Sequence, residues 1–497
     1  MINNLSENYI KKTKIIATVG PSLINGINDV KQLKLKSFSN QVNIASNNIE
    51  QAIKSGVNCF RLNFSHGNQN EHLAKIEIIR SVAHKMDVNV AIMLDTKGPE
   101  IRISKLKKDS YIVKENQIVC ISTKKNIIGD NNSFSVSDAT KTYNMANDVK
   151  PNSIILISDG KLTLKVIDVD ANKGIIKTVA LNTYSISQGK RINLPDTQYS
   201  LPFMSEVDYN DILFACKHNV DYIAASFCNS AKDVKQIRNI LIKSNRPNIQ
   251  IIAKIESSHA IKNLNEIIKA SDGIMVARGD LGLEIPYYDV PYWEKQMIRR
   301  CRFNGKPVIV ATQMLDSLES NILPTRAEVT DVFFAVDRGA DATMLSGETA
   351  NGKYPLSAIN IMSNIDIKSE HLFDYERSIN FYFKKTNFKQ KIKTEIKKLA
   401  NKIKPTNELV EQKFPYSFIA LFSNDMEKIK ALSNIRPGAP IFLFTSTKEL
   451  IRYFSIYYGV QTFFVKNINI SKTEKVQLIN KIINKIKIKV NKYITLN

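Results

Sequence analysis

One pattern recurs along the sequence and limits the folds open to it: a short apolar run that ends in small, polar or charged residues. The eight runs are Lys14–Thr18, Asn58–Leu62, Val90–Leu94, Tyr222–Ser226, Ile251–Ile255, Gly273–Val276, Pro307–Ala311 and Ala342–Leu345. Runs this short suit parallel strands that are buried on both faces. Helical patterns separate the later runs, over residues 231–241, 259–268, 292–304 and 330–338. Strands with helical crossovers favour an α/β (β/α)8 TIM barrel, although a doubly wound open sheet has the same periodicity.

Two stretches depart from this pattern. After the third run the sequence alternates between apolar and polar residues, as in 111–113, 118–121, 154–157 and 162–166, which predicts a small inserted all-β domain. Near the end, the runs Phe418–Phe422, Pro440–Phe444 and Thr462–Val465 predict a separate α/β unit. We therefore expect a barrel built from residues 1–97 and 195–368, an inserted β lid domain at 98–194 and a C-terminal α/β domain at 369–497. Residues 26–46 are polar and without a pattern, and predict a surface excursion before a helix at 48–55.

Composition excludes several classes of protein. The formal net charge is +23, from 70 Lys and Arg against 47 Asp and Glu, which raises the question of a nucleic-acid partner. No basic motif interleaved with aromatic residues is present, so we attribute the charge to compositional bias and expect no such partner. No window approaches the roughly 18 apolar residues of a membrane span, and the N-terminus has no signal-like apolar region. The five scattered cysteines contain no CxxC pair, and we expect a cytoplasmic protein without a membrane partner.

Polar residues follow the predicted barrel strands at their carboxyl ends, where barrel enzymes place their active sites. They include Arg61, Asn63, Ser65, His66, Asp95, Thr96, Glu100, Arg102, Lys254, Glu256, Asp280, Thr312 and Ser346. Glu256 and Asp280 offer the one or two carboxylates that Mg2+ commonly uses together with substrate oxygens. Arg61 and Lys254 offer preorganised positive charge for a phosphoryl group. Any one of them could instead form a structural ion pair or a helix cap; together they predict a metal-assisted enzyme acting on a phosphate or carboxylate.

Seven longer strings carry a resemblance to a known family. They are TKIIATVGPS, FRLNFSHG, LDTKGPEIR, IIAKIES, DGIMVARGDLGLEIP, PVIVATQMLDS and PTRAEVTDV followed by GADATMLSGETANGKYP. In order and spacing they resemble the pyruvate kinases. The resemblance implies transfer of a phosphoryl group from phosphoenolpyruvate to ADP, giving pyruvate and ATP in the last step of glycolysis, by a homotetramer that needs Mg2+ and K+.

The resemblance also implies residue roles. The catalytic residues would be Arg61, Lys254 and Thr312. Substrate would contact Arg61, Lys254, Gly279, Asp280 and Thr312, with Ser346 in the surrounding water network. Glu256 and Asp280 would hold Mg2+, and Asn63, Ser65, Asp95 and the backbone oxygen of Thr96 would hold K+. The nucleotide would lie against Asn63, Phe64, Ser65, His66, Arg102 and Lys190. In this family Glu at the position of Glu100 accompanies dependence on K+.

Four departures from the family pattern limit these implications; one is that Phe333 and Phe334 stand where the family has a small residue and an amide. The first strand-to-helix connection is extended at Gly26–Ser46. Arg191 follows Lys190 where the family has a small residue. In the last domain, Ser423–Glu427 contains two acids and no glycine where regulated relatives have a phosphate-binding loop, so we expect no activation by fructose 1,6-bisphosphate.

Two other functions compete with this interpretation. Another barrel enzyme acting on phosphoenolpyruvate or pyruvate would keep the two acids but lack the inserted domain and the strings FRLNFSHG and LDTKGPEIR. A non-catalytic binding protein on the same fold would be expected to have lost Lys254, Glu256, Asp280 or Thr312, and all four are present.

Overall fold

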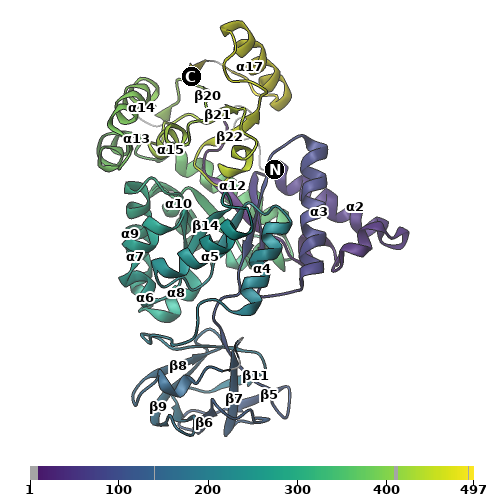
Figure 1. Ribbon diagram of the computed structural model, residues 1–497, viewed down its shortest axis with the longest axis vertical. Coiled ribbons are helices and arrows are strands. Elements are labelled where there is room, and N and C mark those ends of the chain that lie inside the picture. The colour runs from purple at the N-terminus through teal and green to yellow at the C-terminus, as the bar shows by residue number, and fades with distance from the viewer. Residues whose placement is uncertain (1–8, 139, 141, 408–411, 491, 497) are drawn as a thin grey trace.

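The computed structural model describes residues 9–138, 140, 142–407, 412–490 and 492–496. Residues 1–8, which form part of the N-terminal segment without a signal-like region, lie outside the described residues. A parallel barrel occupies the middle of the molecule, with a small β-barrel at one end and the C-terminal α/β unit at the other (Figure 1). Among the described residues, no helix is long and apolar enough to cross a membrane.

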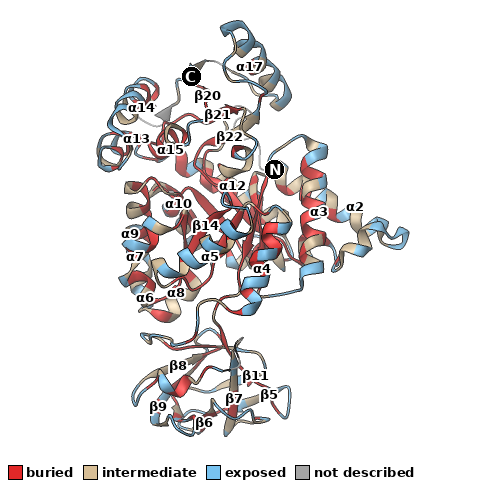
Figure 2. Ribbon diagram, viewed as in Figure 1, coloured by how far each residue is buried: buried red, intermediate tan, exposed pale blue. Residues whose placement is uncertain are grey.

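Eight parallel strands close the central barrel in the order β1-β2-β3-β13-β14-β15-β16-β17. Their bounds are β1 (Lys14–Thr18), β2 (Val57–Asn63), β3 (Ala91–Asp95), β13 (Tyr222–Ala225), β14 (Gln250–Ile255), β15 (Gly273–Ala277), β16 (Val308–Ala311) and β17 (Ala342–Leu345). Alternate residues pack in different places: Ile15 joins the cluster with the surrounding helices, and Ile16 joins the cluster of the barrel interior. Every residue of these strands is buried except Asn58 and Asn63 of β2, which are half-buried (Figure 2). The closure of the sheet confirms the barrel over the open sheet.

The crossover helices begin where side chains cap their first turns. Ser230 and Asp233 form a reciprocal capping box at α5 (Ala231–Lys243), as Thr325 and Glu328 do at α10 (Arg326–Asp337). The helix expected at 259–268 is two helices, α6 (Ser258–Lys262) and α7 (Leu264–Ala270), separated at Asn263. The next helix, α9 (Val290–Phe303), begins with Pro291 in its first turn, where a missing N–H costs nothing.

The expectation of an unpatterned excursion over residues 26–46 was wrong in its second half. Helix α2 (Ser39–Lys54) begins at Ser39, after two short 3-10 turns at Val30–Lys34 and Lys36–Phe38. Its buried face consists of Ala45, Ile49 and Ala52, which are four and three residues apart. Two of these three buried residues are alanines, and many of the residues around them are Asn, Gln or Ser. The apolar face of α2 is therefore hard to recognise in the sequence, although it is buried in the structure.

The small β-barrel, called the β domain below, closes in the order β10-β6-β7-β4-β12-β8-β9. The bounds are β4 (Ile101–Ile103), β6 (Ile118–Ser122), β7 (Ser133–Asp138), β8 (Ile154–Ile157), β9 (Leu162–Asp170), β10 (Ile175–Ala180) and β12 (Arg191–Asn193), and a separate pair is formed by β5 (Ser110–Val113) and β11 (Tyr184–Ser187). Leu162, Leu164 and Val166 are buried while Lys165 between them is exposed. This alternation is the signal that predicted the all-β insertion.

The C-terminal unit contains a parallel sheet in the order β22-β21-β20-β23. The strands are β20 (Phe418–Phe422), β21 (Ile441–Thr445), β22 (Val460–Phe464) and β23 (Tyr493–Leu496), with α14 (Gln390–Ile403), α15 (Met426–Asn434) and α17 (Lys472–Ile486) beside them. Buried polar contacts fix this unit to the barrel: Arg436 Nη1 lies 2.8 Å from Asp341 Oδ1, and Lys14 Nζ donates to the carbonyl of Val460 at 2.6 Å. Lys14 begins β1, so the C-terminal unit joins the barrel at the amino ends of its strands, and the carboxyl ends face the β domain.

Candidate active site

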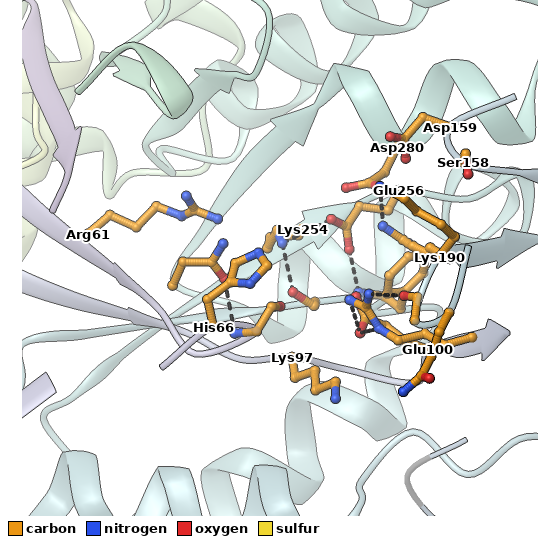
Figure 3. Close-up of a pocket in the computed structure, with 18 residues that line it drawn as sticks. Arg61, His66, Lys97, Glu100, Ser158, Asp159, Lys190, Lys254, Glu256 and Asp280 are labelled. Atoms are coloured by element: carbon orange, nitrogen blue, oxygen red, sulfur yellow. Dashed lines mark hydrogen bonds and ion pairs between the residues drawn. The ribbon is translucent and has the colours of Figure 1, made fainter. Parts of the chain in front are cut away.

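A cleft of about 380 Å³ lies between the carboxyl ends of the barrel strands and the β domain (Figure 3). Of the residues expected at the site from the sequence, the cleft is lined by Arg61, Asn63, Ser65, His66, Glu100, Arg102, Lys190, Lys254, Glu256 and Asp280. The lining does not include Phe64, Asp95, Thr96, Gly279, Thr312 or Ser346. Asp95 nevertheless bonds to the lining residues Arg61, Lys254 and Ser226. Thr312 bonds to Gly279, which precedes the lining residue Asp280 in the sequence.

A buried carboxylate, Asp95, joins the positive groups of the cleft. Its Oδ2 accepts from Arg61 Nε at 2.6 Å, and its Oδ1 accepts from Lys254 Nζ at 3.0 Å and from Ser226 Oγ at 3.1 Å. Burial alone would raise the pKa of Asp95, but Arg61 and Lys254 outweigh burial and hold this pKa below its ordinary value. Asp95 is therefore ionised and fixes the Arg61 and Lys254 side chains in place.

Lys254 extends from β14 into the centre of this arrangement. Its Nζ lies 2.9 Å from Glu256 Oε1 and donates to Ser226 Oγ at 2.7 Å, in addition to its contact with Asp95. Burial alone would lower the pKa of Lys254, but Asp95 and Glu256 more than compensate and raise it. The side chain therefore stays protonated and supplies positive charge; it is not suited to act as a base.

Glu256 and Asp280 are the two carboxylates expected to bind a divalent cation. Glu256 is completely buried; its Oε2 accepts from the Phe227 N–H at 2.6 Å, whereas its Oε1 has no hydrogen-bond partner of good geometry. Burial, with a smaller contribution from the Asp280 carboxylate, raises the pKa of Glu256 to about 7, although the Lys254 ammonium beside Oε1 acts in the opposite direction. Mg2+ commonly uses one or two carboxylates together with substrate oxygens, which is the donor set that Glu256 and Asp280 offer. The residues present therefore fit Mg2+.

The oxygens expected to hold K+ lie at the adjoining ends of β2 and β3. Asn63 is directly opposite Asp95 in the parallel register of these strands. The Oδ1 of Asn63 accepts from the Ser65 N–H at 3.1 Å, and the Thr96 carbonyl accepts from Ser226 Oγ at 2.7 Å. These are neutral and anionic oxygens close to one another, the ligand type that a hard monovalent cation takes, so the residues present fit K+.

Thr312 holds an unusual backbone conformation just beyond β16. Its φ is +66° and that of Gln313 is +52°, in the left-handed region that a β-branched residue rarely adopts. The Thr312 hydroxyl accepts from the Gly279 N–H at 2.7 Å and donates to the Ala311 carbonyl at 2.6 Å, while Arg278 Nη2 donates to the Thr312 carbonyl at 2.8 Å. Strain of this kind persists only where neighbours enforce it, and it gathers at functional sites. Here it directs the Thr312 hydroxyl to the first turn of α8 (Arg278–Glu284).

The β domain contributes a second group of charges to the cleft. Arg102, on β4, donates to Glu100 Oε2 through Nε at 3.0 Å and Nη2 at 2.8 Å, and through Nη1 to the Gly189 carbonyl at 2.7 Å. Lys190 follows Gly189 and also lines the cleft. Arg102 and Lys190, which the family resemblance implies as nucleotide contacts, therefore both line the cleft.

Eight residues that line the cleft were not expected at the site from the sequence, and two of these, Ser226 and Arg191, have side chains that bond to expected site residues. Ser226 contacts Asp95, Thr96 and Lys254. It could have been identified from the sequence, because it is the polar residue that ends the fourth apolar run. Arg191 was noted as a departure from the family pattern and given no role, yet it forms an ion pair with Asp280. Its position in the sequence gave no indication of this partner.

Comparisons with known proteins agree with this architecture. Residues 10–359 match the family model described as the barrel domain of pyruvate kinase. Pyruvate kinases of Mycoplasma genitalium and Mycoplasma pneumoniae are 49% and 48% identical to the chain over 96% and 95% of its length, and each match covers 94% of the relative. A crystal structure of a pyruvate kinase from Cryptosporidium parvum superposes with a TM-score of 0.84 at 32% identity, over 98% of this chain and 93% of that one. The chain belongs to the pyruvate kinase family of phosphotransferases.

Proposed function

We propose that this pyruvate kinase transfers the phosphoryl group of phosphoenolpyruvate to ADP in the cleft between barrel and β domain, and that it depends on both Mg2+ and K+. The observation that carries the proposal is the buried position of Lys254, protonated between Asp95 and Glu256 and close to Arg61 through their shared carboxylate. Positive charge fixed before the reaction stabilises a transferring phosphoryl group without reorganisation in the transition state.

Arg61 and Lys254 would contact the phosphoryl group. Their shared partner Asp95 restricts both side chains, so the entropic cost of ordering them is met in folding and not on substrate binding. Glu256 and Asp280 would hold Mg2+, which neutralises charge on the substrate oxygens when bound. The backbone around Gly279, in the first turn of α8, would bind the substrate carboxylate, and the Gly279 N–H would exchange its bond to the Thr312 hydroxyl for this carboxylate.

Thr312 would orient the substrate at the face where the enolate carbon gains its proton. Its hydroxyl lies against the Gly279 N–H, so it is next to the proposed carboxylate position. The enforced backbone of Thr312 and Gln313 keeps this hydroxyl in one place, which positioning of a reactive carbon requires. Ser346, whose Oγ is buried and has no hydrogen-bond partner in the structure, suits a water network around this face.

K+ would be held by Asn63, Ser65, Asp95 and the Thr96 carbonyl. Glu100 supports the expectation that the cation is required, because its carboxylate engages Arg102 and adds no positive charge to the site. A lysine in its place would bring the positive charge that K+ otherwise supplies.

The nucleotide would lie between Arg102 and Lys190 on one side and the segment from Asn63 to His66, including Phe64, on the other. These side chains come from the β domain and from the end of β2, so a nucleotide between them would bridge the two parts. The β domain would then act as a lid that excludes water, which would otherwise accept the phosphoryl group.

The C-terminal unit is proposed to lack activation by fructose 1,6-bisphosphate. Asp425 caps α15, and its Oδ1 accepts from the N–H groups of Glu427 at 2.9 Å and Lys428 at 3.1 Å. A sugar phosphate would need N–H groups of this kind, and here a carboxylate already occupies them and repels the anion. On the family resemblance we also propose a cytoplasmic homotetramer, which light scattering after size-exclusion chromatography tests.

The proposal is tested by measuring pyruvate formation from phosphoenolpyruvate and ADP while Mg2+ and K+ are omitted in turn. Each omission should lower the rate by at least an order of magnitude, and restoring the missing cation should recover it. A rate unaffected by replacing K+ with a large organic cation would overturn the assignment of Asn63, Ser65, Asp95 and Thr96. A rate unaffected by chelating Mg2+ would overturn the assignment of Glu256 and Asp280.

A further inference from the structure

Arg191 is the first residue of β12, and its side chain reaches across the cleft to the barrel. The guanidinium Nη1 forms a short hydrogen-bonded ion pair with Asp280 Oδ1. The guanidinium carbon also lies 4.6 Å from the centre of the Phe227 ring. Both partners belong to the barrel, so this one side chain joins the β domain to the proposed metal ligand.

The surroundings of Arg191 favour its positive charge. Burial would lower the pKa of Arg191, but Asp280, Glu100 and Glu256 outweigh burial and raise it. Its side chain is 17% exposed and that of Asp280 is 23% exposed, so solvent screens their attraction only in part. The same ion pair acts on Asp280, because Arg191 and Lys254 outweigh burial and lower the pKa of Asp280.

Two weaker contacts join the same surfaces without involving the metal site. Asn193 Nδ2 donates to Glu284 Oε1 at 3.3 Å, and the Tyr199 hydroxyl donates to the same oxygen at 3.2 Å. Glu284 ends α8, the helix that carries Asp280 in its first turn. The β domain therefore has a second contact with α8, through Asn193, that does not involve Arg191.

We propose that Arg191 competes with the divalent cation for Asp280: without the cation it neutralises this carboxylate and fastens the β domain over the cleft, and cation binding detaches it. The proposal rests on the assignment of Glu256 and Asp280 as cation ligands. A dication and a guanidinium at one carboxylate repel each other strongly at such short range. By linkage, cation binding without substrates favours the open β domain, and opening strengthens cation binding. Closure of the β domain as a lid over the metal-bound site then requires the nucleotide that bridges the two parts.

The first test measures Mn2+ binding without substrates, from the electron paramagnetic resonance signal of free Mn2+. Arg191→Gln replaces the guanidinium by a shorter, neutral polar side chain and so removes the competing charge. It should tighten Mn2+ binding by about three- to tenfold, the effect of one partly exposed like charge at short distance. Arg191→Lys should bind Mn2+ like the wild type, because it keeps the charge.

The matched control is Lys177→Gln. Lys177 is exposed on β10, which is paired with β6 and β9 and not with β12, so the substitution removes the same charge from the same domain away from the cleft. Mn2+ affinity should not change in this variant. If Arg191→Gln binds Mn2+ with unchanged or weaker affinity, or if Lys177→Gln tightens binding equally, the competition does not occur.

The second measurement follows hydrogen exchange of the peptide that covers β12. In the wild type, Mn2+ should speed exchange there, whereas in Arg191→Gln exchange should be fast already and insensitive to Mn2+. Slower or unchanged exchange on adding Mn2+ to the wild type contradicts the coupling. Asp280→Asn separates the two proposals: if it leaves Mn2+ binding intact, the metal site and the competition both fail, and if it abolishes binding while Arg191→Gln has no effect, only the competition fails.

Discussion

Replacing Lys254 by methionine removes the charge on which the proposed chemistry depends while keeping most of the side-chain volume. The ammonium contacts three groups, Asp95 at 3.0 Å, Glu256 at 2.9 Å and Ser226 at 2.7 Å, and the side chain is only 10% exposed. Loss of a single preorganised donor typically lowers kcat by about 10²–10³-fold. Because Lys254 carries a full charge in a poorly solvated site, we expect a fall of about 10³-fold or more, or about 4 kcal/mol of barrier.

The same substitution should cost much less stability. Breaking a buried ion pair by removing one partner costs about 3–5 kcal/mol when the other charge is left uncompensated. Asp95 keeps Arg61 at 2.6 Å and the Ser226 hydroxyl, and burial already raises the pKa of Glu256 to about 7, so it can take up a proton. We therefore expect a loss of about 1–3 kcal/mol in the free energy of unfolding.

The assay couples pyruvate to NADH oxidation by lactate dehydrogenase at saturating substrates, and urea unfolding is measured on the same samples. Lys217→Met, an exposed lysine at the end of α4 (Glu206–Lys217), is the matched control and should retain wild-type kcat. The reasoning fails if Lys254→Met retains kcat within tenfold of the wild type. It also fails if the variant is unfolded in buffer, because Lys254 would then be a structural residue.

Three further predictions concern separate features. Glu100→Lys should give activity without K+, measured with tetramethylammonium as the only monovalent cation; a variant as dependent on K+ as the wild type would contradict the role of this position. Fructose 1,6-bisphosphate should leave the half-saturating concentration of phosphoenolpyruvate unchanged, and a several-fold fall would show that Asp425 does not block an effector site. Burial lowers the pKa of His72 to about 4, so the unfolded state binds an extra proton below its ordinary pKa of about 6.5, and the free energy of unfolding should fall by about 3 kcal/mol between pH 7 and pH 4. His72→Gln should flatten that slope in urea titrations at each pH, and an unchanged slope would assign it to other groups.

The barrel could be predicted from the sequence because its strands are buried on both faces. The runs Lys14–Thr18 and Ala342–Leu345 coincide with β1 and β17, because every residue in these two strands is buried. Elements with one weak apolar face were harder to predict. The first half of α2 was missed because alanines mark its buried side, and β23 was missed because Tyr493–Leu496 is a short run in a Lys- and Asn-rich tail.

In the proposed site, too, some residues could be placed from the sequence and others could not. Lys254 and Glu256 could be placed together because they are two residues apart at the carboxyl end of one strand. The register of β2 and β3 brings Asn63 opposite Asp95. The pairing of Arg191 with Asp280 could not be predicted, because the two are 89 residues apart and their contact depends on how the β domain sits over the barrel. Contacts between separately folded parts are set by tertiary packing, which local patterns do not encode.

The most direct measurement of the central claim is the amount of ATP formed for each phosphoenolpyruvate consumed, followed by phosphorus NMR with Mg2+, K+ and ADP present. A cleft that holds both substrates and excludes water should give one ATP for each phosphoenolpyruvate, without free phosphate. Consumption of phosphoenolpyruvate that yields inorganic phosphate in place of ATP, or no consumption at all, would contradict the assignment of this cleft as a phosphoryl-transfer site.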